Sequence, residues 1–419
     1  MQIQLPYGKG TLLLDVPDKN LLDVVLPKEI IPPERPESLI RSALYKPLGT
    51  DRLSEIVSSG DRVAIVVDDH TRPCPNEKLL LPVLEEVKKA GVYDSDVLII
   101  VANGTHKPPS FEMIKEIVGD KVSRNYTVVS NDSVNGEFIS VGTSKRGNKI
   151  EILKDYVDAD VKIILGDIEY HYFAGYGGTR KSILPGLASK NTIQGNHRLL
   201  FEEHAQTGVL RENPVHQEMN EAMRLAGCDF ALNVVLNSNH RIVGVWAGNP
   251  ESVLDAGVKL VDEMYKRHVE HRADIVCAAA NGHPHDLDLY QVVKALHGAT
   301  RVLKENGVIV LVAECRNGHG SQMYVDWLKK YKTSKEVESA LKEDFIIGAH
   351  KAYYHFKAVE KHPVIFVSTM DKTDVEDVFR FKHACDPNTA LEKAFDVAGK
   401  DAKVLVVPQG TTTHLVHRP

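Results

Sequence analysis

The stretch VAIVVDDHTRP, at residues 63–73, decides the fold that we expect for this chain. Its first five residues are all apolar, and two aspartates follow them directly. A short run that is apolar at every position is typical of a strand buried on both faces of a parallel sheet. Residues 97–107, VLIIVANGTHK, repeat the pattern after a predicted helix at 76–90, which we expect Asn76 to cap. The two stretches therefore predict a β-α-β unit.

The same alternation continues along the chain and predicts an α/β fold. Further strands are expected at residues 126–129, 161–165, 230–236, 242–245, 275–279, 308–312, 364–367 and 404–407, and helices at 110–118, 250–268 and 287–303. We predict two domains, each with a mostly parallel sheet flanked by helices. A charged stretch near residue 270 suggests domains at 1–270 and 271–419, with the alternative that the last strand and tail pack back on the first domain.

Length and composition exclude several classes of protein. A chain of 419 residues with 43% hydrophobic residues is long enough for two cores. A net charge of −6 argues against nucleic acid or an anionic membrane as the main partner. Five cysteines without a C-x-x-C pair are typical of reduced thiols. We see no signal peptide and no apolar run long enough to span a bilayer, and therefore expect a cytoplasmic protein.

Polar residues follow the first two predicted strands at the edge where ligands bind in open α/β sheets. Asp68, Asp69 and Arg72 come directly after the first strand and could bind hydroxyls, phosphate or a carboxylate, or could form an ordinary turn with a salt bridge. Gly104 and His106 follow the second strand. His106 is placed for a general base, although a lone loop histidine is more often a surface residue.

A glycine-rich segment at 166–186, GDIEYHYFAGYGGTRKSILPG, carries the densest set of unusual residues. Gly175, Lys181 and Ser182 stand at the offsets of a phosphate-binding Walker A loop. Arg180 occupies the place of that loop's last glycine, so a nucleotide triphosphatase is an alternative and not our leading hypothesis. Lys181 could instead be a phosphate clamp or a point of covalent attachment.

Histidines at three places could be metal ligands. His197 stands seven residues before His204, a spacing that is long for two ligands of one metal. The group at 283–288 holds two histidines and two aspartates, and a solvated loop is the better interpretation there. A single His197 is by itself a weak signal for a metal site.

One polar group lies in the second half of the chain. Tyr290 and Lys294 share a face of the predicted helix at 287–303, with Gln291 beside them. This helix follows the strand at 275–279, so the three residues could face a ligand at the end of that strand. As isolated residues they would pass for a solvated helix face.

Taken together, these segments resemble the nickel-dependent lactate racemase family. The matching stretches occur in family order over essentially the whole chain. They are DDHTRP at 68–73, NGTHK at 103–107, HYFAGYGGTRKSILPG at 171–186, NH at 196–197 and YQVVK at 290–294. Such a set is far more specific than any one motif.

The resemblance implies a cofactor and a role for each of these residues. The cofactor is nickel held by a pyridinium-3-thioamide-5-thiocarboxylic acid mononucleotide, which cofactor maturation proteins must supply. The implied roles are attachment at Lys181, a nickel ligand at His197, cofactor contacts at Asp69, Arg72, Gly175, Gly177 and Gly178, general bases at His106 and His171, and substrate contacts at Arg72, Tyr290, Gln291 and Lys294. The first domain would then tether the cofactor, and the active site would lie in the interdomain cleft.

The implied reaction interconverts D- and L-lactate by removing hydride from C2 while a histidine takes the hydroxyl proton. This route avoids a carbanion next to an ionised carboxylate. The family also includes racemases and epimerases of other 2-hydroxy acids. Three rival functions stay open at this point: a two-base racemase without nickel, an ATPase that uses the Lys181 loop, and a non-catalytic nickel or cofactor carrier.

Overall fold

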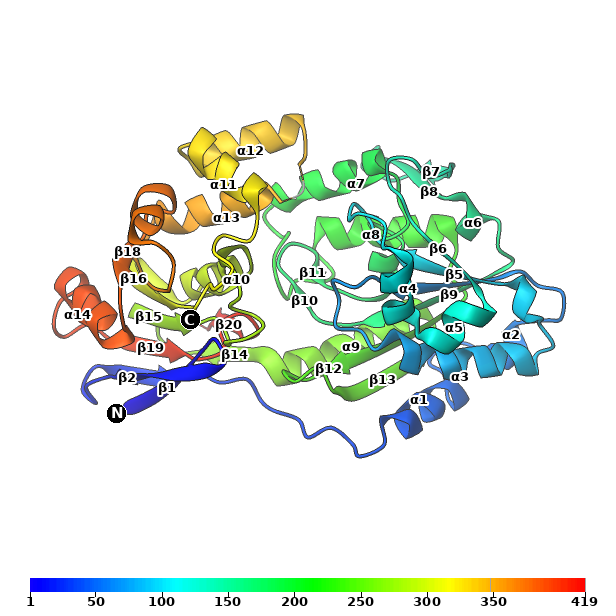
Figure 1. Cartoon of the computed structure of the whole chain (residues 1–419), viewed down its shortest axis with the longest axis horizontal. Coiled ribbons are helices and arrows are strands. Elements are labelled where there is room, and N and C mark those ends of the chain that lie inside the picture. Colours follow the sequence, from blue (N-terminus) through cyan, green and yellow to red (C-terminus); the bar gives the residue numbers. More distant parts are fainter. Residues whose placement is uncertain (347, 419) are drawn as a thin grey trace. The chain divides into compact units, whose positions relative to one another are not determined.

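The computed structural model describes residues 1–346 and 348–418, which form two compact α/β units (Figure 1). The central unit is Glu29–Met264. The terminal unit combines Met1–Lys28 with Tyr265–Pro419. Each unit contains its own six-stranded sheet, so the predicted fold of two α/β domains with mostly parallel sheets is confirmed.

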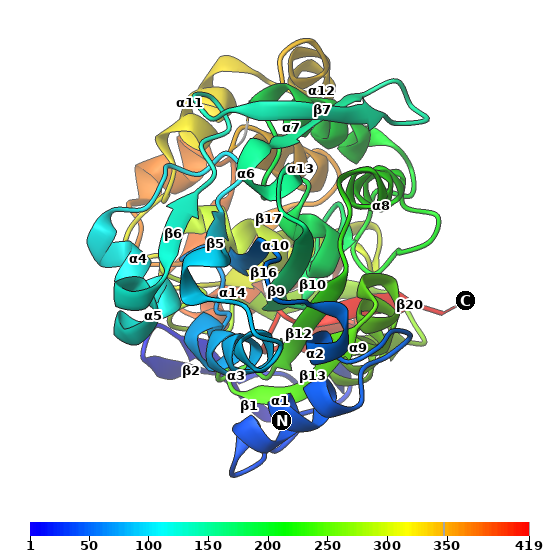
Figure 2. The same ribbon diagram turned by 90° about the vertical axis from the view of Figure 1, so that its right-hand side faces the viewer.

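The sheet of the central unit is parallel except for one edge strand. Its strands, in spatial order, are β13 (Ile242–Gly248), β12 (Phe230–Leu236), β9 (Val161–Asp167), β4 (Val63–Asp68), β5 (Val97–Ala102) and β6 (Thr127–Ser130). Figure 2 shows β6 and β13 at opposite edges. Only the pair of β12 and β13 is antiparallel among these neighbours. The apolar runs of the sequence therefore became buried parallel strands, as predicted.

The central unit also contains helices, some of which bury their apolar faces against this sheet. They are α1 (Pro36–Tyr45), α2 (Leu53–Ile56), α3 (Asn76–Lys89), α4 (Phe111–Val118), α5 (Asp120–Asn125), α6 (Lys154–Val157), α7 (Lys190–His197), α8 (Pro214–Ala226) and α9 (Pro250–Tyr265). Leu79 and Val83 of α3 are fully buried in one core with Ile65 of β4. Burial of each such side chain stabilises the fold by about 1.5–3 kcal/mol. Asn76 does not cap α3 as predicted; it begins the helix and its Nδ2 donates to the Asp68 carbonyl at 2.9 Å.

The sheet of the terminal unit is wholly parallel. In spatial order it contains β18 (Lys382–Ala384), β17 (Val364–Val367), β16 (Leu303–Val312), β15 (Ala273–Ala279), β19 (Val404–Val407) and β3 (Leu21–Val24). Its helices are α10 (Leu289–Thr300), α11 (Gln322–Lys330), α12 (Ser334–Glu343), α13 (His350–Val359) and α14 (Pro387–Ala398). Two further pairs belong to this unit: the hairpin of β1 (Gln2–Tyr7) and β2 (Gly10–Asp15), and the parallel pair of β14 (Lys266–Val269) and β20 (His414–His417).

The predicted division at 1–270 and 271–419 is wrong at its N-terminal end. Strand β3 pairs with β19, and Leu5 and Leu14 of the hairpin join the core of the terminal unit, so residues 1–28 belong there. The charged stretch near 270 is β14 and not a linker, and the chain changes unit between Met264 and Tyr265. The last strands do pair with β3 and β14, which we had assigned to the first domain, but all four lie within the terminal unit.

Two short antiparallel hairpins lie outside the main sheet of the central unit. Strands β7 (Phe138–Thr143) and β8 (Lys149–Leu153) form one hairpin, and β10 (Tyr170–His171) and β11 (Gly175–Tyr176) form another.

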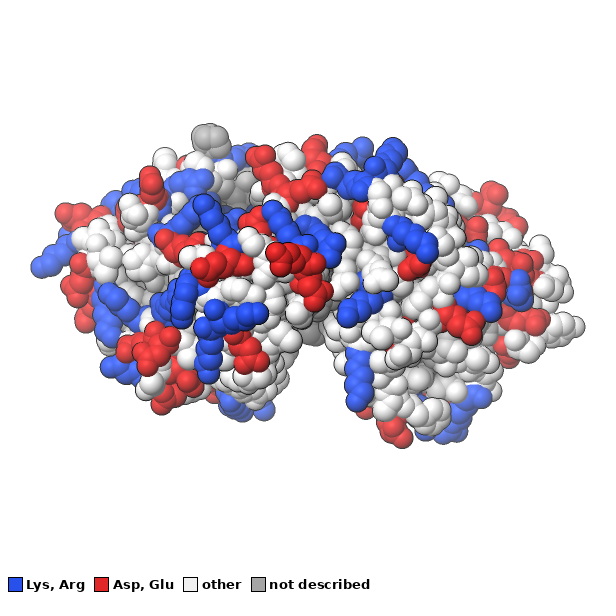
Figure 3. Space-filling view, turned by 90° about the horizontal axis from the view of Figure 1, so that it is seen from above, with Lys and Arg blue, Asp and Glu red and all other residues white. Residues whose placement is uncertain are grey.

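Acidic and basic side chains are intermixed over the face shown in Figure 3, in keeping with 51 basic and 57 acidic residues. Among residues 1–346 and 348–418, no helix combines the length and apolarity that crossing a bilayer requires.

Because the N-terminal hairpin packs into the core of the terminal unit, it should contribute to the stability of that unit. Leu5 is fully buried, whereas Leu13 of the same hairpin is 45% exposed. We expect Leu5→Ala to lower the unfolding free energy of this unit by about 2–5 kcal/mol, and Leu13→Ala to change it by about 0.5 kcal/mol or less. Urea unfolding followed by Trp327 fluorescence, in a Trp246→Phe background, reports the terminal unit alone because the chain has 2 tryptophans. Equal effects of the two leucine variants would contradict this assignment.

Candidate active site

The carboxyl ends of three neighbouring strands bring the predicted polar residues of the central unit to one sheet edge. β4 lies between β9 and β5 and runs parallel to both. Asp68 is the last residue of β4, Asp167 is the last of β9, and Asn103 directly follows β5. Because parallel strands end at the same edge, the loops after them are neighbours, as the sequence predicted.

Asp69 and His106 form a hydrogen-bonded pair at this edge. Oδ2 of Asp69 lies 2.7 Å from Nδ1 of His106, and the Thr71 hydroxyl donates to Oδ1 of Asp69 at 2.6 Å. Burial alone would raise the pKa of Asp69, but the hydrogen bonds from His106 and Thr71 outweigh it and lower the pKa. An ionised Asp69 fixes Nδ1 of His106 as a donor, so Nε2 of the neutral ring carries a lone pair.

Arg72 stands among four carboxylates. Its Nη1 donates to Oε1 of Glu169, and the charges of Asp167, Asp68 and Asp69 act on it as well. Burial would lower the pKa of Arg72, yet these carboxylates raise it above its ordinary value. The guanidinium therefore stays charged, and its position is set by the loops after β4 and β9.

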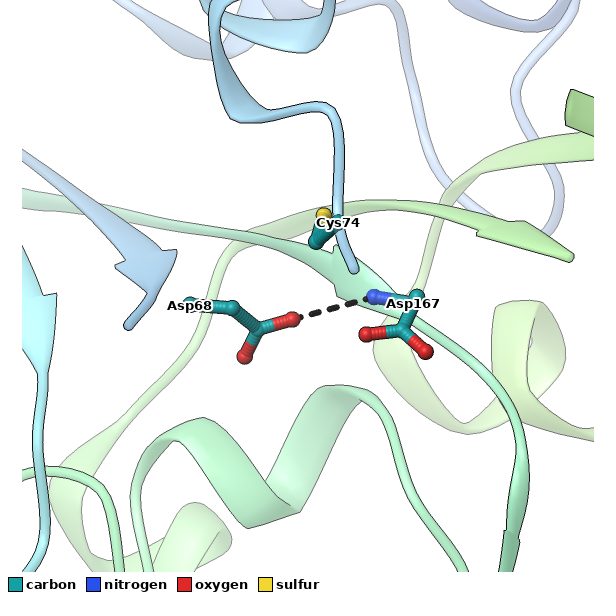
Figure 4. A group of neighbouring side chains, drawn as sticks. All are labelled: Asp68, Cys74 and Asp167. Carbon is teal, nitrogen blue, oxygen red and sulfur yellow. Dashed lines mark hydrogen bonds between the residues drawn. The ribbon is translucent and has the colours of Figure 1, made fainter. Parts of the chain in front are cut away.

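Asp68, Cys74 and Asp167 lie next to one another at this edge, and the side chains of the two aspartates face each other (Figure 4). Their possible ligand atoms lie within 4.8 Å of one another, and the Asp167 amide donates to Oδ2 of Asp68 at 3.1 Å. Burial raises the pKa of all three groups; the charges of Glu169 and Asp68 raise the pKa of Asp167 further, whereas Arg72 and the hydrogen bonds from Asp167 oppose the rise at Asp68. The spacing would suit a metal ion, but no further observation points to one, so we do not assign a metal here.

The glycine-rich segment forms β10, β11 and a short 3-10 helix, Thr179–Ser182. Gly175 has φ +78°, and a Cβ there would lie 2.0 Å from the Val209 carbonyl oxygen. Gly178 has φ +81°, and a Cβ there would lie 2.6 Å from Cγ1 of Ile168. A Cβ at Gly177 would make its closest contact at an ordinary 3.4 Å. The turn therefore needs glycine at 175 and 178 for its own packing.

Arg180 fills the inside of this turn, which the sequence did not indicate. Its side chain is fully buried, and each of its five N–H groups has an acceptor. The acceptors are the carbonyl oxygens of Ala174, Tyr176, Gly177 and Gly178 and Nδ1 of His216, at distances of 2.6–3.4 Å. Backbone carbonyls therefore point inward, whereas a Walker A loop directs N–H groups at phosphate. This arrangement argues against the ATPase alternative.

Lys181 and His197 are the next residues of the predicted site. Lys181 is half-buried, and burial together with the charge of Arg72 lowers its pKa to about 7 against the opposing effect of Glu169. His197 ends α7, and burial followed by the charge of Lys181 lowers its pKa to about 3. The Phe173 ring lies 5.1 Å from the ring of His197 and 4.5 Å from that of His171. One aromatic side chain thus contacts both histidines.

The position of α7 depends on a buried carboxylate that sequence reasoning missed. Glu218 of α8 is 2% exposed. It accepts hydrogen bonds from Asn196 Nδ2 at 3.0 Å, Ser144 Oγ at 2.7 Å and Asn148 Nδ2 at 3.1 Å. Asn196 directly precedes His197, so this network holds the end of α7 against α8 and the β7–β8 hairpin. The sequence did not indicate this network, because its members are single Asn, Ser and Glu residues far apart along the chain.

Tyr290, Gln291 and Lys294 lie on α10 of the terminal unit, as predicted. Gln291 and Lys294 are exposed, but Tyr290 is half-buried and is not part of a solvated face. Its ring lies 6.1 Å from that of Tyr324 and 5.2 Å from Nζ of Lys351, a buried lysine that the sequence analysis missed.

The group at 283–288 is only partly the solvated loop that we predicted. Asp286 is buried and accepts hydrogen bonds from the Gly8 and Glu314 amides at 2.7 and 3.1 Å. Asp288 caps α10 through the Gln291 amide at 3.0 Å. His283 is exposed, as is His204 in the central unit. The two aspartates therefore have structural roles.

Comparison with known proteins shows which family the chain resembles along its whole length. Sequence profiles of the lactate racemase N-terminal and C-terminal domains match residues 7–208 and 269–415. The lactate racemase of Thermoanaerobacterium thermosaccharolyticum is 34% identical over 422 residues, 98% of each chain. That of Lactiplantibacillus plantarum is 31% identical over 417 residues, 97% of this chain and 98% of that protein.

Solved structures extend the likeness to three dimensions. The lactate racemase apoprotein of T. thermosaccharolyticum superposes with a TM-score of 0.91 at 33% identity, covering 100% of both chains. A protein of Thermotoga maritima shares the fold, with a TM-score of 0.65 at 17% identity over 91% of this chain and 98% of its own. The chain therefore belongs to the lactate racemase family, a family of isomerases.

Proposed function

We propose that this protein is a racemase that interconverts D- and L-lactate. The observation that carries the proposal is the pairing of a low-pKa lysine, Lys181, with a buried neutral imidazole, His197, beside the edge that holds Asp69 and His106. An amine that loses its proton near neutral pH can form a covalent bond, and a neutral imidazole can bind a metal. Formation of one lactate enantiomer from the other, followed by chiral chromatography, is the direct test.

We propose that Lys181 carries the nickel pincer cofactor and that His197 binds its nickel. The residues fit such a group, because the buried neutral imidazole of His197 could add a protein ligand to a nickel ion held by the sulfur and carbon donors of the cofactor. Three buried polar atoms have no hydrogen-bond partner among the described residues and could pair with such a group: Asn103 Oδ1, Thr179 Oγ1 and Asn233 Nδ2. When bound, the cofactor would supply an electrophilic carbon that accepts hydride from C2 of the substrate.

His106 and His171 would accept or return the hydroxyl proton, and the hydrogen bond at Nδ1 favours a different tautomer in each ring. Nδ1 of His106 faces the ionised Asp69, which leaves the lone pair on Nε2 ready to accept a proton. Nδ1 of His171 accepts the Ala174 amide at 3.2 Å, so the neutral ring holds its proton on Nε2. His106 is therefore set to accept a proton at Nε2, whereas His171 can give a proton to the substrate oxygen only from its doubly protonated form, which it would gain by taking up a proton first.

Arg72 and Lys294 are proposed to hold the substrate carboxylate, with Tyr290 and Gln291 beside them. Arg72 is kept charged by its carboxylate neighbours. Asp69, Arg72 and Gly177 are also proposed cofactor contacts, and Gly175 and Gly178 would act mainly through the shape of the turn. Since Lys294 belongs to the terminal unit, this assignment requires the substrate to contact both units. Exclusion of water there would protect the keto acid formed during turnover.

The cofactor also implies partners and a compartment. We propose that dedicated maturation proteins deliver it to the apoprotein. The five cysteines are all free thiols, which supports a reducing cytoplasmic location.

His197→Ala is expected to lose nickel and racemase activity together, because the imidazole is the ligand that the protein contributes. His204→Ala is the matched control, since His204 is exposed and seven residues away. Metal analysis of purified, cofactor-loaded protein should show less than about a tenth of the wild-type nickel in the first variant. Full nickel content with full activity in His197→Ala would move the ligand elsewhere.

Lys294→Ala is expected to lower kcat/KM about 10- to 100-fold, the usual cost of losing a hydrogen bond to a charged group. The cofactor content should not change, because Lys294 lies outside the central unit. Lys400→Ala, at another exposed lysine of the terminal unit, serves as the control. Wild-type kinetics in Lys294→Ala would place the substrate site in the central unit alone.

The fate of the C2 hydrogen distinguishes the proposed route from two-base proton exchange. If His106 and His171 handle only the hydroxyl proton, C2 should keep its protium during racemisation in heavy water. NMR of the first product formed should show this, and deuteration at C2 should give a primary isotope effect. Substantial solvent deuterium at C2 would instead favour direct proton exchange by the two histidines.

A further inference from the structure

Arg180 is a buried charge whose partners are all neutral. Its five donors reach four backbone carbonyls and one imidazole, and no carboxylate is paired with it in the part of the chain that the structure describes. Burial lowers its pKa to about 9, so it is still charged at neutral pH. A buried charge is costly unless it is paired or hydrogen-bonded, and charges kept at that cost are a mark of functional sites.

The bonds of Arg180 fix the chain that leads directly into Lys181. Four of its acceptors lie between residues 174 and 178, and the fifth, His216, stands on α8. Burial, followed by the charge of Arg180, lowers the pKa of His216 to about 2, so this ring is a neutral acceptor. Its other nitrogen lies 3.1 Å from the Asn220 amide. The guanidinium thus joins the turn to a long helix.

The turn is held in a shape that a free chain would avoid. Thr179, between Gly178 and Arg180, has φ +40°, a value that residues with a side chain rarely adopt. Its amide donates to Oδ1 of the fully buried Asn233 on β12 at 3.1 Å. Strain of this kind persists where surrounding contacts enforce it, and it clusters at functional sites.

Four charged groups act on the Lys181 amine. Asp68 ends β4 and Arg72 follows it, Glu169 follows β9, and Arg180 is the preceding residue. Burial and Arg72 lower the pKa of Lys181 most, Glu169 and Asp68 oppose them, and Arg180 adds to the lowering. Only the deprotonated amine is a nucleophile.

We propose that Arg180 is a positioning residue for cofactor attachment: its guanidinium shapes the turn that presents Lys181. The proposal rests on the proposed function of Lys181 as the attachment site. Arg180→Lys keeps the charge without the planar five-donor group, and Arg180→Gln removes the charge as well. Arg224→Gln, which removes an exposed arginine of α8, is the control for both Arg180 variants.

The geometric effect is measured as the rate of mass gain when apoprotein is produced with the cofactor maturation proteins. Both Arg180 variants should gain mass at least about tenfold more slowly than wild type, while Arg224→Gln should match it. Lys181→Ala must gain none. If Lys181→Ala gains the same mass as wild type, the proposed function of Lys181 fails. If wild type loads through Lys181 and a folded Arg180 variant loads equally fast, the role of Arg180 fails instead.

Circular dichroism establishes whether each variant folds. If an Arg180 variant does not fold, His216→Leu decides, because it removes one of the five acceptors and leaves the arginine in place. Slower loading in folded His216→Leu supports the role of Arg180. Loading at the wild-type rate in that variant overturns it.

Discussion

The site depends on three neighbouring strands that run in the same direction. Because β9, β4 and β5 pair in parallel, Asp167, Asp68 and the residues after Ala102 reach one edge together. A shift of one residue in either pairing would turn the side chains of a strand to the opposite face. The apolar runs that fix this register are fully buried, so the hydrophobic core determines where the polar chemistry stands.

Charge at this edge affects stability in opposing directions. The pKa of Asp69 is lowered, so its contribution is present above its unfolded pKa and is lost as pH falls through the folded value. The pKa values of Asp68 and Asp167 are raised, so the unfolded chain releases their protons first and stability falls as pH rises through that range. Lys181, with a pKa near 7, is the converse case, since stability rises with pH between that value and 10.5. At neutral pH, the ionised Asp69 therefore stabilises the folded chain, whereas the buried Asp68, Asp167 and Lys181 destabilise it.

Local patterns in the sequence predicted the strands well, because a buried parallel strand leaves a short, wholly apolar run. Strands β12, β17 and β19 have the predicted bounds. The division into units was wrong because the pairing of β3 with β19 joins residues nearly 400 positions apart, and no local pattern encodes a pairing at that distance.

The candidate site shows the same limit. Asp69, Arg72 and His106 could be predicted because they directly follow apolar runs. The resemblance to a known family, and not the residues alone, suggested roles for Lys181, His171 and His197. Glu218 and Lys351 could not be found, since each is buried by contacts between distant elements. Arg180 stood out as a departure from the Walker A pattern, but its five bonds to backbone and imidazole have no signature in the sequence.

The buried Arg180 distinguishes this glycine-rich turn from a phosphate-binding loop. A phosphate cradle needs inward N–H groups and an empty centre, whereas this turn directs carbonyls inward and fills its centre with a cation. Its outward side is then free to present Lys181. Strain at Thr179 and an unpaired charge both oppose folding, and the packing of α8 and β12 against the turn must offset them. A chain that only needed to connect β11 to α7 would gain stability by relaxing this turn, and the proposed role in presenting Lys181 would account for that cost.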